Sequence, residues 1–98
     1  MDIRKAINDK EVIAAIDGRI DTTTAPALEQ ELKDSYDSCE TLILDFTDVE
    51  YISSAGLRVL LSAHKTMSKK SGMKLRNVSE DIMEIFEVTG FADILSIE

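Results

Sequence analysis

The sequence predicts an α/β protein with one domain, in which a mixed, mostly parallel β-sheet is flanked by helices. Two observations predict this class. First, β-prone apolar segments alternate with segments whose apolar residues recur every three or four positions. Second, residues 41–46 are apolar at odd and even positions apart from Asp45, which is typical of a strand covered on both faces. The resulting element order is β-β-α-β-α-β-α-β, and strands joined through helices lie parallel in right-handed crossovers.

The chain opens with a predicted β-hairpin. Residues 3–7 and 12–16 are β-prone runs, and the polar residues 8–10 between them are typical of a turn. Strands joined by so short a turn are antiparallel, so this hairpin makes the sheet mixed. We expect the second strand to end at Gly18, where the polar sequence GRIDTTTAP begins.

The first helix is expected over residues 25–38. Thr22 to Thr24 are candidates for its N-cap, and Pro26 stands in the first turn, where its fixed φ suits a helix. The residues predicted to face the core recur at helical spacing: Ala25, Leu28, Leu32 and Tyr36. Cys39, the single cysteine, is predicted to be a buried packing residue, because one cysteine cannot form an internal disulfide.

The strand at residues 41–46 is predicted to lie at the centre of the sheet. The acidic residues within 45–50 are expected to mark the end of this strand and a solvated loop. A second helix is expected over residues 54–70, with Ser71 and Gly72 ending it. Its predicted inward residues again follow helical spacing: Leu57, Leu60, Leu61, His64 and Met67.

The C-terminal part of the chain is predicted to supply a further strand and helix. Residues 73–78 read as the strand, and Ser79 is the candidate N-cap of a helix whose first turn carries two acidic residues. Gly90 is expected to end this helix. Its predicted inward residues are Ile82, Ile85, Phe86 and Thr89. Residues 91–97 are expected to form a final short turn and strand.

The composition limits the partners that the protein can have. A net charge of −8 argues against a general affinity for nucleic acid or for anionic membranes, which require a positive surface. No apolar run reaches the ~20 residues of a membrane helix, and no signal peptide opens the chain, so we expect a cytoplasmic protein. The window 57–79 holds six basic residues and no acid, but it lacks the interleaved aromatics of a single-strand binding platform.

We find no pattern that supports catalysis. The sequence has no Walker loop, no GxGxxG and no GxSxG motif. His64, the single histidine, is ten residues from Ser54 along the predicted helix, a separation of roughly 15 Å at 1.5 Å per residue. The candidate metal ligands are scattered along the chain. We therefore expect no enzymatic activity and no cofactor.

The stretch DFTDVEYISSAGLRVLL contains small residues between the central strand and the second helix. A serine pair just before a helix is typical of an N-cap. Capping does not explain Gly56, because glycine in a helix costs about 1 kcal/mol relative to alanine. Gly56 therefore suggests that another group approaches this backbone closely.

Together with GRIDTTTAPAL and VTGFADILSI, this stretch resembles the STAS domain of bacterial anti-sigma factor antagonists. The resemblance spans nearly the whole chain and implies one STAS domain over residues 1–98, with a mixed sheet flanked by helices. It implies a non-catalytic switch in which the unmodified protein binds an anti-sigma factor that is also a serine kinase, and so frees the sigma factor. The kinase phosphorylates one serine of the antagonist, and a PP2C-type phosphatase reverses this.

The family pattern D-S-[ST]-G corresponds here to residues 53–56, with sequence SSAG, so the resemblance implies Ser54 as the phosphorylated residue. Ser53 replaces the aspartate of the pattern and is left as a second possible acceptor. Asp21 corresponds to an acidic position in a loop near the phosphorylation site. The residues expected at the partner-binding surface are Asp21, Thr22, Ser53, Ser54, Ala55, Gly56, Leu57 and Arg58.

Two other readings of the sequence stay open at this point. STAS-like domains also serve as phosphorylation-independent scaffolds or subunits of transport or sensory assemblies. A nucleotide-binding domain is a third possibility, although the sequence has no phosphate loop to support it. The serine at position 54 favours the phosphorylated switch over the scaffold.

Overall fold

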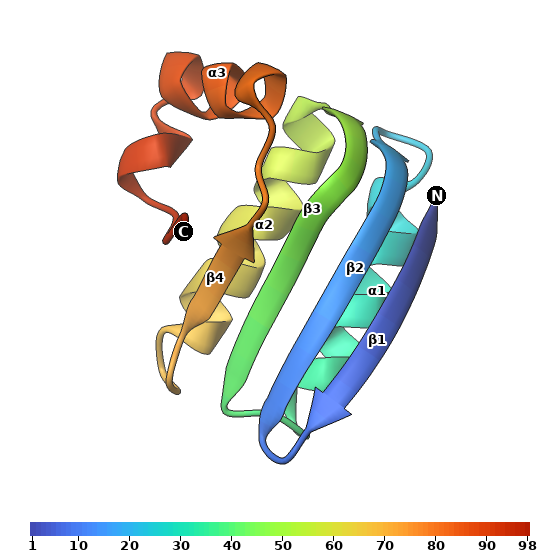
Figure 1. Cartoon of the computed structure of the whole chain (residues 1–98), viewed down its shortest axis with the longest axis vertical. Coiled ribbons are helices and arrows are strands. Elements are labelled where there is room, and N and C mark those ends of the chain that lie inside the picture. Colours follow the sequence, from blue (N-terminus) through green and yellow to red (C-terminus); the bar gives the residue numbers. More distant parts are fainter.

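The computed structural model describes residues 1–98, and its four strands form one sheet in the order β1-β2-β3-β4 (Figure 1). The strands are β1 (Asp2–Asn8), β2 (Glu11–Ile20), β3 (Thr41–Ile52) and β4 (Met73–Arg76). β1 pairs antiparallel with β2, whereas the β2–β3 and β3–β4 pairs are parallel. The predicted mixed, mostly parallel sheet is therefore confirmed.

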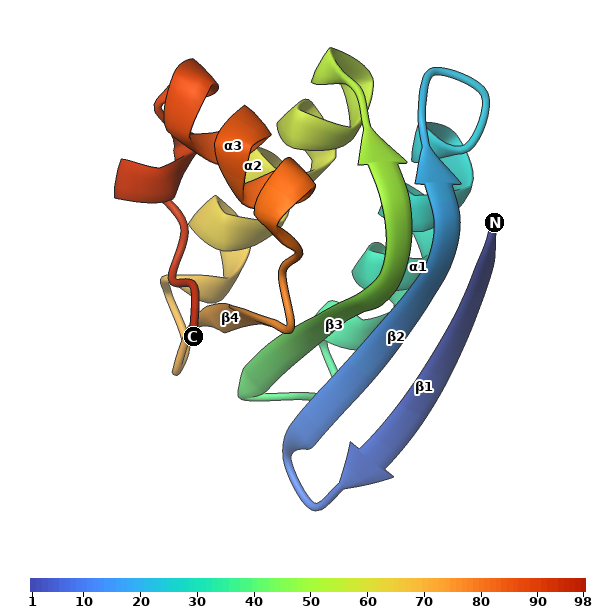
Figure 2. The ribbon, with the colours of Figure 1, turned by 45° about the horizontal axis from the view of Figure 1, so that its top comes forward.

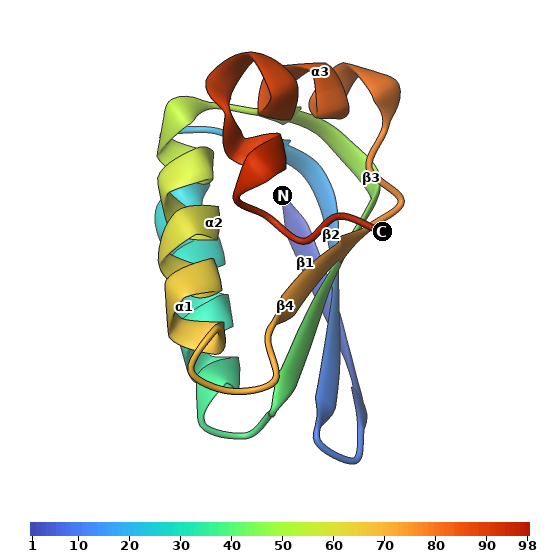
Figure 3. The same cartoon turned by 90° about the vertical axis from the view of Figure 1, so that its left-hand side faces the viewer.

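Three helices complete the fold: α1 (Ala25–Tyr36), α2 (Ser54–Met67) and α3 (Glu80–Thr89). α1 and α2 lie side by side on one face of the sheet, and α3 lies across the end at which α2 begins (Figure 3). A 3-10 helix, Phe91–Asp93, follows α3. Instead of the predicted last strand, the chain forms a single parallel bridge between Leu75 and Ile97.

β2 is longer than predicted, because Gly18 does not end it. Gly18 has φ +108°, and the pairing register with β3 shifts between Gly18 and Arg19. Such an irregularity favours glycine, which adopts positive φ at little cost. The strand continues beyond it to Ile20, which pairs with Ile52 of β3. The extra residue at this irregularity is Glu50 of β3, because consecutive residues Gly18 and Arg19 pair with Val49 and Tyr51.

β3 is also longer than predicted, since it runs through the acidic residues that were expected to form a loop. Asp48 pairs in register with Asp17 of β2 and is exposed, whereas Val49 and Ile52 are buried. Asp45 is half-buried, and its Oδ1 atom accepts from Thr47 Oγ1 at 2.6 Å. Acidic side chains are compatible with this strand because they lie away from the core.

The ends of α1, α2 and β4 differ from the predicted ones by two or three residues. α1 ends at Tyr36, and Lys70 Nζ donates to the carbonyl oxygens of Tyr36 and, at 3.0 Å, of Cys39. This lysine binds the carbonyl groups at the end of α1. α2 ends at Met67, and β4 ends at Arg76, before Asn77 with its positive φ of +59°.

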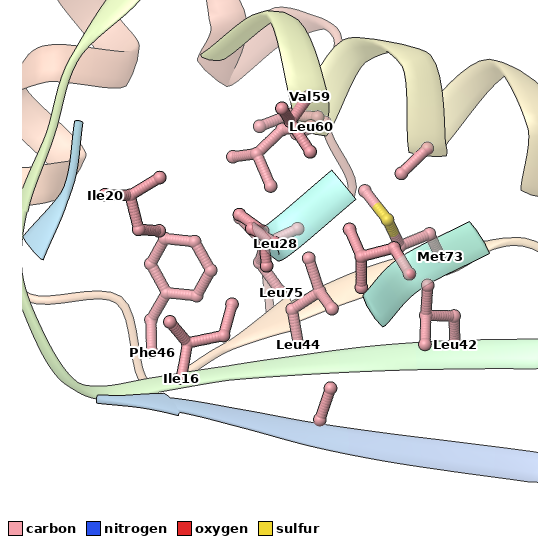
Figure 4. Packing of buried hydrophobic residues seen from close by; sticks show 14 of the residues in the cluster. Ile16, Ile20, Leu28, Leu42, Leu44, Phe46, Val59, Leu60, Met73 and Leu75 are labelled. Atoms are coloured by element: carbon pink, nitrogen blue, oxygen red, sulfur yellow. The ribbon is translucent and has the colours of Figure 1, made fainter. Parts of the chain in front are cut away.

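The core is one cluster of 23 buried residues between the helices and the sheet. Figure 4 shows side chains of α2 facing those of the strands, such as Leu60 above Leu44. The predicted helix stripes are confirmed at these buried positions: Ala25, Leu28, Leu32, Leu57, Leu60, Met67, Ile82 and Phe86. Tyr36, Leu61, His64 and Ile85 are half-buried.

Two differences in the core have a clear physical cause. Val59 and Ala63 were not predicted to be buried, but both are, because α2 packs against α1 as well as the sheet and so buries more than one stripe. Thr89 was predicted to face inward but is exposed, and its hydroxyl donates to the carbonyl oxygen of Ile85 at 2.7 Å. Cys39 is buried as predicted, and burial raises the pKa of its thiol.

The outer strand β1 is fastened to α1 by a charged residue. Lys5 pairs with the buried Ala14 in the β1–β2 register, so its side chain points toward the helices. Its ammonium group donates to the carbonyl oxygen of Glu31 at 2.6 Å and lies 2.9 Å from the carboxylate of the same residue. Lys5 therefore ties the edge strand to the helix.

Candidate functional surface

The predicted site residues meet at one end of the molecule, where the parallel strands β2 and β3 reach their carboxyl ends (Figure 2). β2 leads there into the loop before α1, and β3 leads directly into α2. The backbone N–H of Ser53 donates to the carbonyl oxygen of Ile20 at 2.8 Å, which joins the two strand ends. The sheet therefore holds the start of α2 next to the β2–α1 loop.

The two adjacent serines have different surroundings. Ser53 is the N-cap of α2, with extended backbone angles, and its carbonyl oxygen accepts from the N–H of Leu57 at 2.9 Å. Its hydroxyl oxygen is buried, forms no hydrogen bond and does not cap the helix. Ser54 is the first helical residue and is exposed. Only the second serine is presented to solvent, a difference that the sequence does not reveal.

The β2–α1 loop is organised around Asp21. Its Oδ1 atom accepts from the N–H groups of Thr23 and Thr24 at 3.0 and 3.1 Å and from the Thr23 hydroxyl at 2.7 Å. The bond from the Thr23 hydroxyl, together with the two N–H groups, lowers the pKa of Asp21. Asp21 is therefore a stable anion at neutral pH and holds the loop in one shape.

The threonines do not cap α1 in the manner predicted. Thr24 occupies the N-cap position but makes no side-chain cap bond. Its hydroxyl donates instead to the carbonyl oxygen of Arg19 and accepts from the N–H of Asp21, both at 2.8 Å. The carbonyl oxygen of Asp21 accepts from the N–H of Ala25 at 2.8 Å. The aspartate and Thr24 thus fix the loop, and Thr22 is left exposed.

A groove of about 260 Å³ lies between the first turns of α1 and α2. Its lining residues are Thr22, Ala25, Pro26 and Glu29 on one side and Ala55, Arg58 and Val59 on the other. Arg58 is exposed and forms no ion pair, whereas Glu29 lies 3.4 Å from Lys33. The groove therefore carries an unpaired cation, which follows the exposed serine by four positions in α2.

Gly56 has a structural explanation that differs from the close approach of an outside group. It is buried, and a Cβ atom placed on it lies 2.6 Å from Ile20 Cγ2 and 2.7 Å from Ile52 Cγ1. Both distances are far below a normal carbon contact. The glycine lets α2 pack closely on the ends of β2 and β3. Leu57 is also buried, so neither residue contributes a side chain to the exposed surface.

The sequence reasoning missed several residues of this surface. Pro26 was predicted only as a first-turn residue of the first helix, and Glu29 was not singled out, but both line one wall of the groove. Arg19 and Tyr51 were also not singled out, although the Arg19 guanidinium lies 4.5 Å from the Tyr51 ring centroid. Pro26 in the first turn of α1 was the one sequence signal that could have pointed to this wall of the groove. The Arg19–Tyr51 pair depends on strand register and leaves no local signal.

No group of three or more His, Cys, Asp or Glu side chains is arranged to hold a metal ion. None of the helices combines the length and the apolar character needed to cross a membrane.

The fold and this surface define a small α/β domain that presents a serine at the start of a central helix. The chain belongs to the STAS domain family, whose sequence profile matches residues 2–98. It is 35% identical over 98 residues to the anti-sigma-B factor antagonist of Bacillus subtilis strain 168, an alignment that covers 99% of this chain and 88% of that protein.

Solved structures show the same fold. An anti-sigma factor antagonist from Mycobacterium paratuberculosis matches with a TM-score of 0.88 and 26% identity, over 98% of this chain and 83% of that one. The Bacillus cell fate determinant SpoIIAA, solved in its phosphorylated form, matches with a TM-score of 0.76 and 15% identity, over 99% of this chain and 91% of that one. At this identity the second likeness concerns the fold alone.

Proposed function

We propose that this protein is an anti-sigma factor antagonist that acts by partner switching. In its unmodified form it binds an anti-sigma factor serine kinase, which releases the sigma factor, and phosphorylation of Ser54 ends this binding. The observation that carries the proposal is the exposed hydroxyl of Ser54 at the start of α2, beside the ordered β2–α1 loop. The similarity to named antagonists supports the same role. Residues 1–98 act as one STAS domain in the cytoplasm, as a regulator and not an enzyme.

The modification is a phosphoryl transfer from ATP to Ser54. The Oγ atom forms a bond to the γ-phosphorus, and the bond from that phosphorus to the β–γ bridging oxygen breaks, so ADP leaves. The hydroxyl proton passes to a base of the kinase. A PP2C-type phosphatase removes the phosphate by hydrolysis: a water oxygen forms a bond to phosphorus, the bond from phosphorus to Oγ breaks, the serine oxygen takes up a proton, and inorganic phosphate leaves.

Ser53 is a poorer acceptor than Ser54 in this proposal. A kinase must align the attacking oxygen with the γ-phosphate, and the Ser53 hydroxyl oxygen is buried. Its modification requires the first turn of α2 to open. In this proposal the exposed or half-buried residues Asp21, Thr22, Ala55 and Arg58 supply the partner surface together with Ser54, whereas the buried Gly56 and Leu57 contribute only backbone.

The test uses the anti-sigma factor kinase from the organism that produces this protein. The purified protein is incubated with this kinase and ATP, and the phosphate is located by peptide mass mapping. Wild type and Ser53→Ala should be modified on Ser54, and Ser54→Ala should not be modified. Phosphate on Ser53 with Ser54 unmodified overturns the site assignment. Kinase binding that persists in the fully phosphorylated protein overturns the switch and favours the phosphorylation-independent scaffold.

A further inference from the structure

Arg58 is the basic residue in the first two turns of α2 and follows Ser54 by four positions. It is exposed, and no carboxylate lies within ion-pair distance of its guanidinium. Arg19, a cation at the neighbouring end of β2, is by contrast engaged, because it lies 3.9 Å from Asp21 and stacks on Tyr51. Arg58 is therefore available to pair with a new anion.

Helix geometry brings Arg58 to Ser54. The two residues are four positions apart in α2, so their side chains project from the same face one turn apart. The Cβ atoms of such a pair are about 5–6 Å apart, within reach of a long side chain. A guanidinium also matches phosphate oxygens with two parallel hydrogen bonds, which a lysine ammonium cannot reproduce.

We propose that Arg58 is the internal counter-ion of the phosphate on Ser54. This inference rests on the proposed modification of that serine. The groove is the alternative location for the guanidinium, where Glu29 on the opposite wall is its competing anion. A phosphate with about −1.5 to −2 charge attracts the arginine more strongly than one carboxylate that already has a lysine partner.

This pairing changes the surface at two places together. The phosphate adds negative charge at the helix start, and Arg58 leaves the groove to bind it. A partner that binds in the groove therefore no longer finds the Arg58 guanidinium on the α2 wall. The phosphorylated state differs from the unmodified one by more than the added group.

The test uses protein in which phosphoserine is placed at position 54 during translation, so that no kinase is required. The second pKa of the phosphate, about 6 in the absence of partners, is measured by ³¹P NMR titration. We expect it to be lower by about 0.3 to 0.7 in the wild type than in Arg58→Gln, the range for a helical i,i+4 ion pair strengthened by charge-assisted hydrogen bonds. The Nε–H signal of Arg58 should shift with the same midpoint.

Matched variants separate this pairing from a general charge effect. Lys65→Gln removes the same charge from an exposed position about two turns further along α2 and should leave the phosphate pKa unchanged. Arg58→Lys should retain part of the effect. Equal pKa values in wild type and Arg58→Gln, with no shift of the Arg58 signal, overturn the inference. Because phosphoserine is already present, this result leaves the kinase-binding proposal unaffected, and a failure of kinase binding does not change the phosphate pKa that is measured here.

Discussion

The N-termini of α2 and α3 have similar backbone conformations but differ in side-chain capping and in first-turn charge. Each helix has a serine N-cap in an extended conformation, Ser53 at φ −95° and Ser79 at φ −69°. At α3, the Ser79 hydroxyl accepts from the N–H of Ile82, and Glu80 and Asp81 occupy the first turn. At α2, the cap hydroxyl makes no bond, and the first turn has no acid.

The difference shows that side chains of the protein stabilise the N-terminus of α3, whereas the N-terminus of α2 is left free to interact with an added anion. Acidic residues near a helix N-terminus interact favourably with its positive end, and a cap oxygen satisfies one free N–H group. α3 has both. α2 has neither, so a phosphate on Ser54 meets unneutralised positive charge and free N–H groups. A start that lacks internal stabilisation is suited to receive an added anion.

The largest expected effect is on binding. Phosphate on Ser54 should weaken kinase binding at least about 100-fold, because a dianion that loses its water at an interface costs several kcal/mol and 1.4 kcal/mol is tenfold in affinity. Isothermal titration of both forms with the kinase measures this. Ser54→Ala should bind like the unmodified protein and stay bound in ATP.

The fold itself should barely respond to the same phosphate. A negative group at a helix start contributes about 0.3 to 1 kcal/mol, so the two forms should melt within about 8 °C of each other. A larger difference, or loss of α2, contradicts a local electrostatic switch.

The second prediction concerns Gly56, which lets the first turn of α2 pack against Ile20 and Ile52 of the sheet. Gly56→Ala should destabilise the protein by about 1–2 kcal/mol, because the overlap with Ile20 and Ile52 outweighs the roughly 1 kcal/mol gained in helix propensity. Urea denaturation measures the change. Ser62→Ala, at an exposed position of the same helix, should not destabilise. A more stable Gly56→Ala protein contradicts the packing explanation.

The third prediction compares the removal of each serine side chain. Ser79→Ala should lower the free energy of unfolding by about 1 kcal/mol, since it removes the bond to the Ile82 N–H. Ser53→Ala should leave stability unchanged or raise it by up to about 1 kcal/mol, because it removes an unpartnered buried hydroxyl. Equal losses in the two variants, measured by urea denaturation, mean that both serines cap their helices.

The smallest effect should come from Asp21 in the loop beside α2. Its pKa in the folded protein lies below 3.8, mainly because the Thr23 hydroxyl donates to it. Its contribution is therefore complete above that ordinary value and is lost as the pH falls through the folded-state pKa. The difference in free energy of unfolding between wild type and Asp21→Asn, measured by urea denaturation, should shrink as the pH falls into the acid range. At neutral pH the same difference should be smaller when both proteins carry Thr23→Val. If this difference in free energy of unfolding instead grows as the pH falls, the ionised Asp21 carboxylate does not stabilise the loop.

Local sequence was sufficient to predict the elements whose signals are local. The cap at Ser79 and the stop at Gly90, which has φ +84°, are both confirmed. The apolar periodicity also identified the inward faces of the helices. These features depend on residues within one or two turns of each other, so they can be recognised without the fold.

The parts that could not be predicted depend on contacts between distant segments. The extension of β2 past Gly18 follows from its pairing with β3. The burial of Gly56 depends on Ile20 and Ile52, which come from two strands. Residue patterns likewise do not distinguish the inward hydroxyl of Ser53 from the exposed side chain of Ser54, because the sheet sets the direction in which α2 leaves β3.

The lysine that ties β1 to α1 has a consequence for self-association. β1 is the edge of the sheet, and an unpaired edge strand can template the addition of a strand from another molecule. A second chain that pairs with β1 must accommodate Lys5, a charged side chain that points inward from the edge, and its bonds to Glu31 hold it there. Inward charges of this kind are a known protection against edge-to-edge aggregation. The longer open edge of this sheet is thus poorly suited to permanent pairing with another chain.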